Sequence, residues 1–388
     1  MMKITAIRSK PRNIRNVGAF FPNAIKLTTG EIFVQMLWGC DRRATAEEMA
    51  EFLAVDYPTD WHFWADYNQK WLGKGLDRAQ NMNGYWSRST DGGETFTDWG
   101  MPPILSYAEA KGELIGFAWQ THRDRTGNLF LRSWRSADRC ATFSAPKDIP
   151  IEAPAFEADV LPDFHRGCVH LGGNRWLLAA YARFAGENHD RVIVFRTDDA
   201  FKTLRYEATV ADWEEGLAGE AGFNEAAICR VPDGRLLAVF RNDGFCDMYQ
   251  SHSCDEGKTW TKPCRFGAPG VDPCLTVLDN GAVLCAYGRP GIHVAVSFDG
   301  GDHWAGRETL LWPPFEIDGV SGETVLRNSF GHQRTCGYTD LVPLGEDRAM
   351  VFYSAPLNWR ESTHKVPWIG ECQKEFRIYA VEITVKKE

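Results

Sequence analysis

Three polar residues stand at positions suited to chemistry, each at the start of an apolar segment that is predicted to be a β-strand. Glu225 precedes AAICRV, His165 lies in PDFHRGCVHL, and Asp272 precedes PCLTVL. A carboxylate that opens an apolar strand is costly to bury without a partner, which favours a pocket for Glu225. His165 is a candidate acid, base or hydrogen-bond donor, or alternatively a core histidine. Asp272 is suited to accept hydrogen bonds from ligand hydroxyl groups, or alternatively to cap the loop before Pro273.

These residues must be positioned by a series of hairpins, each made of two apolar runs joined by a tight turn. Several turns carry Asp-Gly, Asn-Gly or Thr-Gly, which favour tight connections between antiparallel strands. The six hairpins have the sequences AIKLTTGEIFVQML, YAEAKGELIGFAW, HLGGNRWLLAAY, AAICRVPDGRLLAVF, CLTVLDNGAVLCAY and YTDLVPLGEDRAMVFY. Aligning five of them on their turns places Phe21, His165, Glu225, Asp272 and Tyr338 at equivalent strand starts.

A second repeat follows the hairpins, with the form Ser-x-Asp-x-Gly-x-Thr-Trp. Its copies, three close and two degraded, begin at Ser89, Ser136, Thr197, Ser253 and Ser297. The aspartate can accept hydrogen bonds from nearby backbone N–H groups, and the glycine supplies a positive φ at low steric cost. The motif therefore predicts a tight turn between two antiparallel strands, repeated at intervals typical of propeller blades.

Together the two repeats predict an all-β fold, a six-bladed β-propeller of four-stranded antiparallel blades. Six units in a chain of 388 residues give roughly 65 residues each, which suits blades with insertions. We expect one propeller domain over residues 1–388, with the N-terminal segment and the C-terminal strand FRIYAVEITV sharing a blade and closing the ring.

Residues 39–82 interrupt the first unit. Thr45 followed by Glu48 forms a capping box, which predicts a short helix and makes the insertion partly helical. The rest of the insertion is dense in Trp, Tyr and Asp, and long insertions in compact folds are often functional. It is expected to be a lid or pocket rim, the alternatives being a dimer contact or packing over the blade edge.

Composition excludes several classes of protein. With 43 Lys and Arg against 52 Asp and Glu, the formal net charge is −9, which argues against a general nucleic-acid-binding protein. No apolar stretch approaches about 20 residues, so no membrane insertion is expected. The N-terminal sequence lacks the apolar run of a secretory signal, and 11 cysteines, several within apolar runs, favour free thiols. A cytoplasmic location is therefore expected, with a processed exported form as the alternative.

The sequence contains no dinucleotide fingerprint, phosphate loop, CxxC pair or metal triad. We therefore expect no cofactor and no metal ion, with a lone calcium as the alternative. Aromatic residues make up 13% of the chain, a content that suits both half-buried strands and flat sugar-binding surfaces.

The Asp turns, their spacing and the hairpins resemble the Asp-box (BNR-repeat) sialidase or neuraminidase superfamily of six-bladed propellers, over nearly the whole chain. The resemblance implies that the Asp turns lie on the outside, away from a central pocket. The string FNE ending at Glu225 is similar to the segment whose glutamate assists the nucleophile. The string CGYTDL is similar to the segment carrying the catalytic tyrosine, here Tyr338. Arg241 and Arg289 resemble two of the arginines that bind the substrate carboxylate.

The implied chemistry has a physical reason. A sialic acid bears a carboxylate on its anomeric carbon, which would repel an anionic nucleophile, whereas a neutral Tyr activated by a Glu avoids the repulsion. Arginine forks bind the carboxylate in bidentate fashion. The resemblance places the general acid in the first-blade insertion, which offers Asp41, Asp56, Asp60 and Asp66. We select Asp41 because it closely follows the strand, with Asp66 as the alternate.

The chain also departs from the family pattern. Phe20 stands where the first carboxylate arginine is expected, and Leu37-Trp38-Gly39 replaces an acidic-x-Arg pattern. The residues available to substitute for the missing arginine are Arg12, Arg15, Arg183 and Arg334. His332, Gln333 and Arg334, just ahead of the tyrosine, are candidates for the pocket edge, with a solvated loop as the alternative.

The resemblance implies an exo-acting, sialidase-like glycoside hydrolase that acts on an acidic sugar terminus, with Tyr338 and Glu225 as the nucleophilic pair. One alternative is a polysaccharide lyase, or a hydrolase of different mechanism, acting on a uronic-acid glycan, with His165 and Tyr338 as acid and base. Another is a non-catalytic glycan-binding propeller, since a fold alone does not fix a function. The expected partner in each case is a glycan; the oligomeric state is left open.

Overall fold

A computed structural model describes most of the strand-forming part of the chain. The described residues are 4–8, 12–15, 21–36, 86–102, 104–157, 160–219, 221–242, 246–288, 291–304, 306–311, 316–317, 320–321, 338–356 and 376–387. Within these ranges the secondary structure is entirely β-strand and connecting turns. The predicted helix and the whole of the 39–82 insertion lie outside them.

The strands form six antiparallel groups of four, which we call blades 1 to 6 in chain order. Blades 1 to 3 comprise β3 (Pro22–Lys26), β4 (Ile32–Met36), β5 (Trp86–Ser89) and β6 (Thr97–Trp99); β7 (Ser106–Ala110), β8 (Glu113–Arg123), β9 (Leu129–Ser136) and β10 (Lys147–Glu152); and β11 (Asp163–Gly172), β12 (Arg175–Ala182), β13 (Arg191–Thr197) and β14 (Leu204–Ala211). Blades 4 to 6 comprise β15 (Phe223–Arg230), β16 (Leu236–Asn242), β17 (Asp247–Ser253) and β18 (Cys264–Pro269); β19 (Val271–Val277), β20 (Val283–Gly288), β21 (Ile292–Ser297) and β22 (Gly306–Leu311); and β25 (Thr339–Pro343), β26 (Arg348–Pro356), β27 (Phe376–Lys387) and β1 (Ile4–Arg8). β2 (Arg12–Arg15) also pairs with β27, and β23 (Glu316–Ile317) pairs with β24 (Val320–Ser321).

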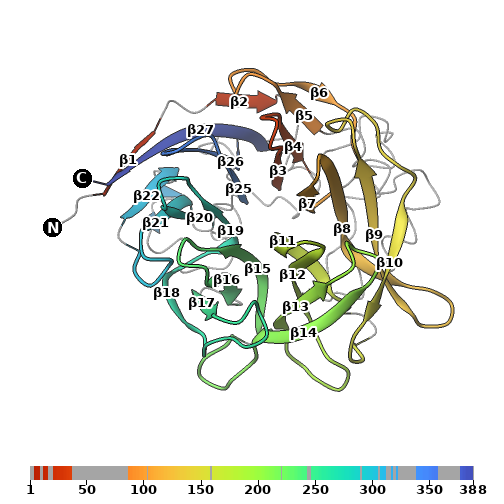
Figure 1. The fold of residues 1–388 in the computed structure, drawn as a ribbon. Coiled ribbons are helices and arrows are strands. Elements are labelled where there is room, and N and C mark those ends of the chain that lie inside the picture. Colours follow the sequence, from red (N-terminus) through yellow and green to blue (C-terminus); the bar gives the residue numbers. More distant parts are fainter. Residues whose placement is uncertain are drawn as a thin grey trace.

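The blades are arranged as a ring around a common axis, with the first strand of each blade innermost (Figure 1). Short parallel contacts join neighbours, as where Arg166 of β11 pairs with Ala227 of β15. The ring closes in blade 6, because β1 pairs antiparallel with β27, from Ile4 opposite Lys387 to Arg8 opposite Ile383. The prediction that the two ends of the chain share a blade is confirmed.

Apolar side chains hold neighbouring blades face to face. Between blades 3 and 4, for example, Leu177 and Val194 pack with Ile228 and Phe240 in one buried cluster. Strands alternate their side chains between two faces, so a strand whose two faces both meet a neighbouring blade is apolar on both. The described cysteines, predicted as thiols, are all free, and Cys285 is fully buried in such an interface.

The Asp turns form as the sequence motif predicts. In the fourth, the Ser253 hydroxyl donates to Asp255 at 2.8 Å and accepts from the Gly257 N–H at 2.9 Å, while the Thr259 N–H donates to Asp255 at 2.9 Å. These hydrogen bonds, above all the one from the Thr259 hydroxyl, lower the pKa of Asp255 to about 2. Gly257 has a φ of +89°, which explains the residue preference at that place.

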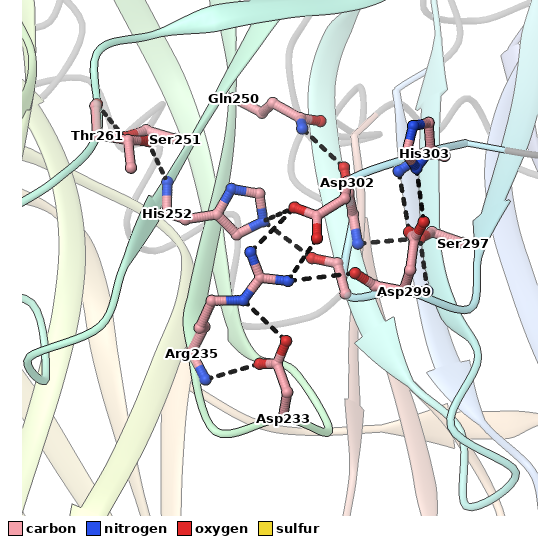
Figure 2. A network of polar contacts seen from close by, with 12 residues as sticks. Asp233, Arg235, Gln250, Ser251, His252, Thr261, Ser297, Asp299, Asp302 and His303 are labelled. Carbon is pink, nitrogen blue, oxygen red and sulfur yellow. Dashed lines mark hydrogen bonds and ion pairs between the residues drawn. The ribbon is translucent and has the colours of Figure 1, made fainter.

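The Asp turns also connect adjacent blades. Figure 2 shows Arg235, from the hairpin between β15 and β16, donating to Asp302 of the fifth Asp turn at 2.8 Å and to Asp233 at 2.8 Å. A similar contact joins Arg175 of blade 3 to Glu256 of the fourth Asp turn at 2.6 Å. The turns therefore help to fix the angle between blades.

Hairpins and Asp turns lie at one end of the ring and the inner-strand starts at the other. In blade 4, Leu236 pairs with both Arg230 and Ser253, which places the hairpin and the Asp turn together. Asn224 pairs with Arg241 at the opposite end of the same blade. Within the described residues, no helix is long and apolar enough to cross a membrane.

Candidate functional site

The starts of the inner strands converge on the axis of the ring, at the end opposite the Asp turns (Figure 1). The strand register is irregular at three of these starts, between Phe164 and Cys168, between Asn224 and Ala227, and between Val271 and Cys274. An irregularity of this kind interrupts the alternation of side chains and redirects those within it. It therefore brings polar side chains of apolar strands to the axis.

The backbone at these starts is strained in a consistent way. Phe21, Glu225 and Asp272 have φ values of +52°, +44° and +47°, in the left-handed region that residues with a β-carbon rarely adopt. All three are among the five positions that aligning the hairpins makes equivalent. Such strain persists only where surrounding contacts compensate for it, and it clusters at functional sites.

Arg166 is the centre of a buried polar cluster at the axis, which we call the axial cluster. Its Nε and Nη2 atoms donate to the two carboxylate oxygens of Asp272 at 3.0 and 2.9 Å. Nη2 also donates to the Pro22 carbonyl at 2.8 Å, and Nη1 contacts Asp340. A single guanidinium therefore ties blade 3 to blades 1, 5 and 6.

The charges of the axial cluster depend on one another. Burial acts against the cation, but the carboxylates of Asp272 and Asp340 hold the pKa of Arg166 above its ordinary value. Burial raises the pKa of Asp340, while Arg166 and the N–H groups of Ala24 and Leu341 oppose the rise. Removing the cation would leave two buried carboxylates without their main partner.

Glu225 is fixed from two sides. Its Oε1 accepts from Arg241 Nη1 at 3.1 Å, and its Oε2 accepts from the Asp272 N–H at 2.9 Å. Both side chains are mostly buried, with 12% of Glu225 and 17% of Arg241 exposed. Arg241, which approaches from the end of β16, gives the mostly buried Glu225 a charged partner, while the pocket role of Glu225 stays a prediction. Charge-assisted hydrogen bonds of this kind fix the position of the carboxylate.

His165 lies on the other side of Asp272. Its Nε2 is 3.3 Å from Asp272 Oδ1, and burial lowers the pKa of His165 to about 4, so the ring is neutral near pH 7. The position of Asp272 favours the proton on Nε2. Nδ1 is buried and has no hydrogen-bond partner among the described residues. A ligand hydroxyl group that donated to Nδ1 would satisfy it.

Tyr338 forms an aromatic platform with Phe21. The two ring centroids are 3.7 Å apart and the rings are inclined by 36°. Both pack with Val271, the residue before Asp272, so the tyrosine lies beside the axial cluster. Tyr338 is 5% exposed. The aromatic pair therefore lies next to the charged groups of the axial cluster.

A carboxyl group with a raised pKa lies next to this site. Asp163, the first residue of β11, accepts from the Tyr181 hydroxyl at 3.1 Å. Burial, reinforced by the charge of Asp190 and opposed by the hydrogen bond from Tyr181, raises the pKa of Asp163 to about 7. Asp163 is partly exposed, and it lies two residues before His165. It can therefore donate a proton at neutral pH, as a general acid must.

The structure brings five of the predicted site residues to the axis, and their roles stay predictions. Those five are His165, Glu225, Arg241, Asp272 and Tyr338. Asp41, Arg289 and Arg334, together with Asp66 and Phe20, lie outside the described residues. No group of three or more His, Cys, Asp or Glu side chains suited to a metal ion occurs in the described ranges.

Sequence reasoning missed Arg166, Asp340 and Asp163. Arg166 directly follows His165, and Asp340 lies in the same string as Tyr338, so both stand in segments already singled out. An arginine and an aspartate within apolar strands are the same signal that pointed to Glu225. Asp163 carries no such signal, since it precedes the apolar run.

Comparison with known proteins gives a family and a fold. The profile of the BNR repeat-like domain family matches residues 95–342. A protein of unknown function from Dyadobacter fermentans has a similar structure, with a TM-score of 0.63 and 18% identity, over 98% of this chain and 99% of that one. So does the Hadza microbial sialidase Hz136, with a TM-score of 0.57 and 14% identity, over 97% and 68%.

A third similar structure is the Penicillium chrysogenum α-L-arabinanase complexed with arabinobiose, with a TM-score of 0.56 and 11% identity, over 96% of this chain and 98% of that one. No curated protein matches the sequence. At these identities the structural likeness establishes the fold, which is that of six-bladed propellers that include glycoside hydrolases.

Proposed function

From the premise that this chain belongs to the BNR repeat-like domain family, we propose that it is an exo-acting glycoside hydrolase whose active site is the axial cluster. The observation that carries the proposal is the fixation of Glu225 between Arg241 and the N–H of Asp272, whose preceding residue Val271 packs with Tyr338. A rigidly held carboxylate is suited to accept the proton of a neighbouring nucleophile during cleavage of a glycosidic bond.

In the proposed reaction, the Tyr338 oxygen forms a bond to the anomeric carbon as the bond to the leaving oxygen breaks. The phenol proton passes to Glu225, and a general acid protonates the leaving oxygen. Water then hydrolyses the glycosyl–tyrosine bond and restores both groups. Asp41 is the acid that the sequence predicts, and Asp163 is the described carboxyl group whose protonation suits the role.

The proposed substrate is an acidic sugar terminus, such as sialic acid or a related sugar acid. A neutral Tyr nucleophile suits it, because an anionic nucleophile would be repelled by the sugar carboxylate. Arg241, with Arg289 and Arg334 as sequence candidates, would bind that carboxylate.

A second candidate is a neutral sugar such as a terminal arabinofuranose, and a specific observation favours it. Arg166 is paired with Asp272 and Asp340, and Arg241 is paired with Glu225. The charges of both arginines are therefore already balanced by protein carboxylates, and an added sugar carboxylate would compete with Glu225. The fold likeness to an α-L-arabinanase agrees with this candidate without deciding it.

The test is a screen with chromogenic α-sialosides, uronides, α-L-arabinofuranosides and other neutral glycosides. We expect turnover of one class, and a fall in kcat of at least about 10²-fold for Tyr338→Phe and Glu225→Gln. Tyr206→Phe is the matched control, because Tyr206 lies on outer strand β14 and hydrogen-bonds Thr209. Tyr338→Phe with wild-type turnover would remove the tyrosine from the mechanism.

The same screen separates the other functions. A product with a new ultraviolet absorbance, from a carbon–carbon double bond, would identify a lyase and contradict hydrolysis. Saturable glycan binding without turnover of any class would identify a binding module.

A further inference from the structure

A pocket lies at the end of the ring that carries the Asp turns, opposite the axial cluster. Its volume is about 530 Å³. It is bounded by the blade 1 hairpin at Thr29 and Gly30, by the first Asp turn at Thr90 and Gly92, and by Leu344 of blade 6. Pockets of this size hold ligands as large as a monosaccharide or larger. We call it the basal pocket.

Three cations and one carboxylate line the basal pocket: Lys26, Arg88, Arg139 and Glu31. The carboxylate is 5% exposed and is engaged by the Thr29 hydroxyl. Burial acts to raise the pKa of Glu31, but the Thr29 hydrogen bond and the two arginines bring it below its ordinary value, so Glu31 is ionised. The lining therefore has two positive charges in excess at neutral pH.

The two arginines are incompletely paired. Arg88 Nη2 is 3.6 Å from Glu31 Oε1, and Arg139 Nη1 is 3.2 Å from the same oxygen. The first of these separations is too long for a hydrogen bond. Arg88 Nε is buried and has no hydrogen-bond partner among the described residues. A buried donor without an acceptor is costly, so an oxygen atom supplied by a ligand would lower the free energy of the site.

Arg88 is held in place by packing as well as by charge. Its guanidinium carbon lies 4.5 Å from the ring centroid of Trp99 and 5.8 Å from that of Phe33. Stacking of this kind fixes the plane of the guanidinium and limits the entropy lost on binding.

Other blade junctions differ from this one. The hairpin arginines Arg175 and Arg235 each donate to a carboxylate of the next Asp turn, at 2.6 and 2.8 Å, so their donors are used within the protein. In the basal pocket the corresponding hairpin residue is Glu31, and it shares one oxygen between two arginines. Arg88 and Arg139 therefore keep donors available to an outside anion, unlike Arg175 and Arg235.

We propose that the basal pocket binds an anionic saccharide unit, a monosaccharide-sized ligand whose carboxylate is held by Arg88, Lys26 and Arg139. Arg88 Nε supplies the buried donor, and the hydroxyls of Thr29 and Thr90 lie among the lining groups that can meet sugar hydroxyls. The site is distinct from the axial cluster and does not depend on the activity proposed there.

The test is calorimetric titration of the whole chain with sodium glucuronate, glucose and inorganic sulfate. We expect glucuronate to bind, glucose not to bind, and affinity to fall as sodium chloride rises. Arg88→Gln and Arg139→Gly should each weaken glucuronate binding by at least about tenfold, because each removes a charge-assisted contact. Arg205→Gln is the matched control, since Arg205 is exposed on blade 3 and pairs with Glu152.

Several outcomes would overturn the proposal. Glucuronate affinity that is the same in Arg88→Gln as in Arg205→Gln would place the binding elsewhere, for example at the axial cluster. Sulfate binding as tight as glucuronate binding would show that the pocket is a general anion site. It would contradict the proposal that the pocket recognises a saccharide. Absence of any heat up to about 10 mM ligand would exclude a useful affinity. Circular dichroism of each variant separates loss of binding from loss of fold.

Discussion

Replacing Arg166 with methionine is the sharpest perturbation of the axial cluster. Methionine keeps an unbranched side chain of similar length but removes the hydrogen bonds to Asp272 and the Pro22 carbonyl and the ion pair with Asp340. Asp272 is 1% exposed and Asp340 is 7% exposed, so water cannot easily replace the lost donors. We therefore expect a large effect from a single side chain.

The magnitude follows from the number of charges left behind. Breaking one buried ion pair by removing a partner costs about 3–5 kcal/mol, and here the removed cation served two carboxylates. Against a total free energy of unfolding of roughly 5–15 kcal/mol, the loss should be at least about 3 kcal/mol at pH 7. The triple variant Arg166→Met, Asp272→Asn, Asp340→Asn removes the buried charges and should recover most of this loss.

The assay is urea denaturation followed by tryptophan fluorescence at pH 5 and pH 7. Without Arg166, burial raises the folded-state pKa of Asp272 and Asp340 above the value of about 3.9 expected for the unfolded chain. The folded state then binds protons more strongly than the unfolded state, so stability falls as pH rises. The deficit of Arg166→Met should thus be smaller at pH 5 than at pH 7. A deficit below about 1 kcal/mol that does not change with pH would refute this account.

Three further predictions concern other parts of the ring. Because the pKa of Asp163 is about 7 when folded and about 3.9 when unfolded, its contribution to stability is fully present below pH 4 and is lost as pH rises through 7. In the wild type the free energy of unfolding should fall by up to about 4 kcal/mol from this group between pH 4 and pH 8, and Asp163→Asn should abolish that fall. The same pH dependence in urea titrations of both proteins would contradict the raised pKa of Asp163. Arg139 has a φ of +58° and an ion pair with Glu31. Arg139→Gly should leave the melting temperature unchanged or raise it, with a gain in the free energy of unfolding of up to roughly 0.5–1 kcal/mol. A clear drop in melting temperature would mean that the ion pair outweighs the strain. Arg235→Gln removes the contact to Asp302 in Figure 2. The change should cost about 1 kcal/mol in low salt and less in high salt, a difference that urea titrations at two ionic strengths would detect or exclude.

The parts of the fold that the sequence predicts are those encoded locally. The turn around Asp255 is made by Ser253, Gly257 and Thr259, all within a few residues, so the motif alone predicts its hydrogen bonds. Hairpins are local in the same sense, and their number predicts six blades. Closure of the ring by β1 and β27 follows once an unpaired strand is recognised at each end of the chain.

The contacts of the site are not local, and that is why sequence reasoning finds the positions but not the partners. Arg166 and Asp272 are separated by 106 residues, and nothing in either segment indicates that the guanidinium of one meets the carboxylate of the other. Glu225 and Arg241 are only 16 residues apart in one hairpin, so their pairing becomes predictable once the β15–β16 register is known. The sequence predicts that Glu225 faces a pocket and that Arg241 binds a substrate carboxylate, whereas the structure pairs the two with each other.

The strain at the inner-strand starts suggests why the site lies at the axis. A residue with a β-carbon at positive φ costs on the order of 1–3 kcal/mol, and Phe21, Glu225 and Asp272 each adopt one where glycine would be easier. Glycine would relieve the strain, but it would remove the ring of Phe21 and the two carboxylates that pair with Arg241 and Arg166. The strained residues are also mutually supported, because the N–H of Asp272 donates to Glu225 and Phe21 packs on Tyr338. The strain is thus accepted at positions whose side chains meet at the axis of the ring.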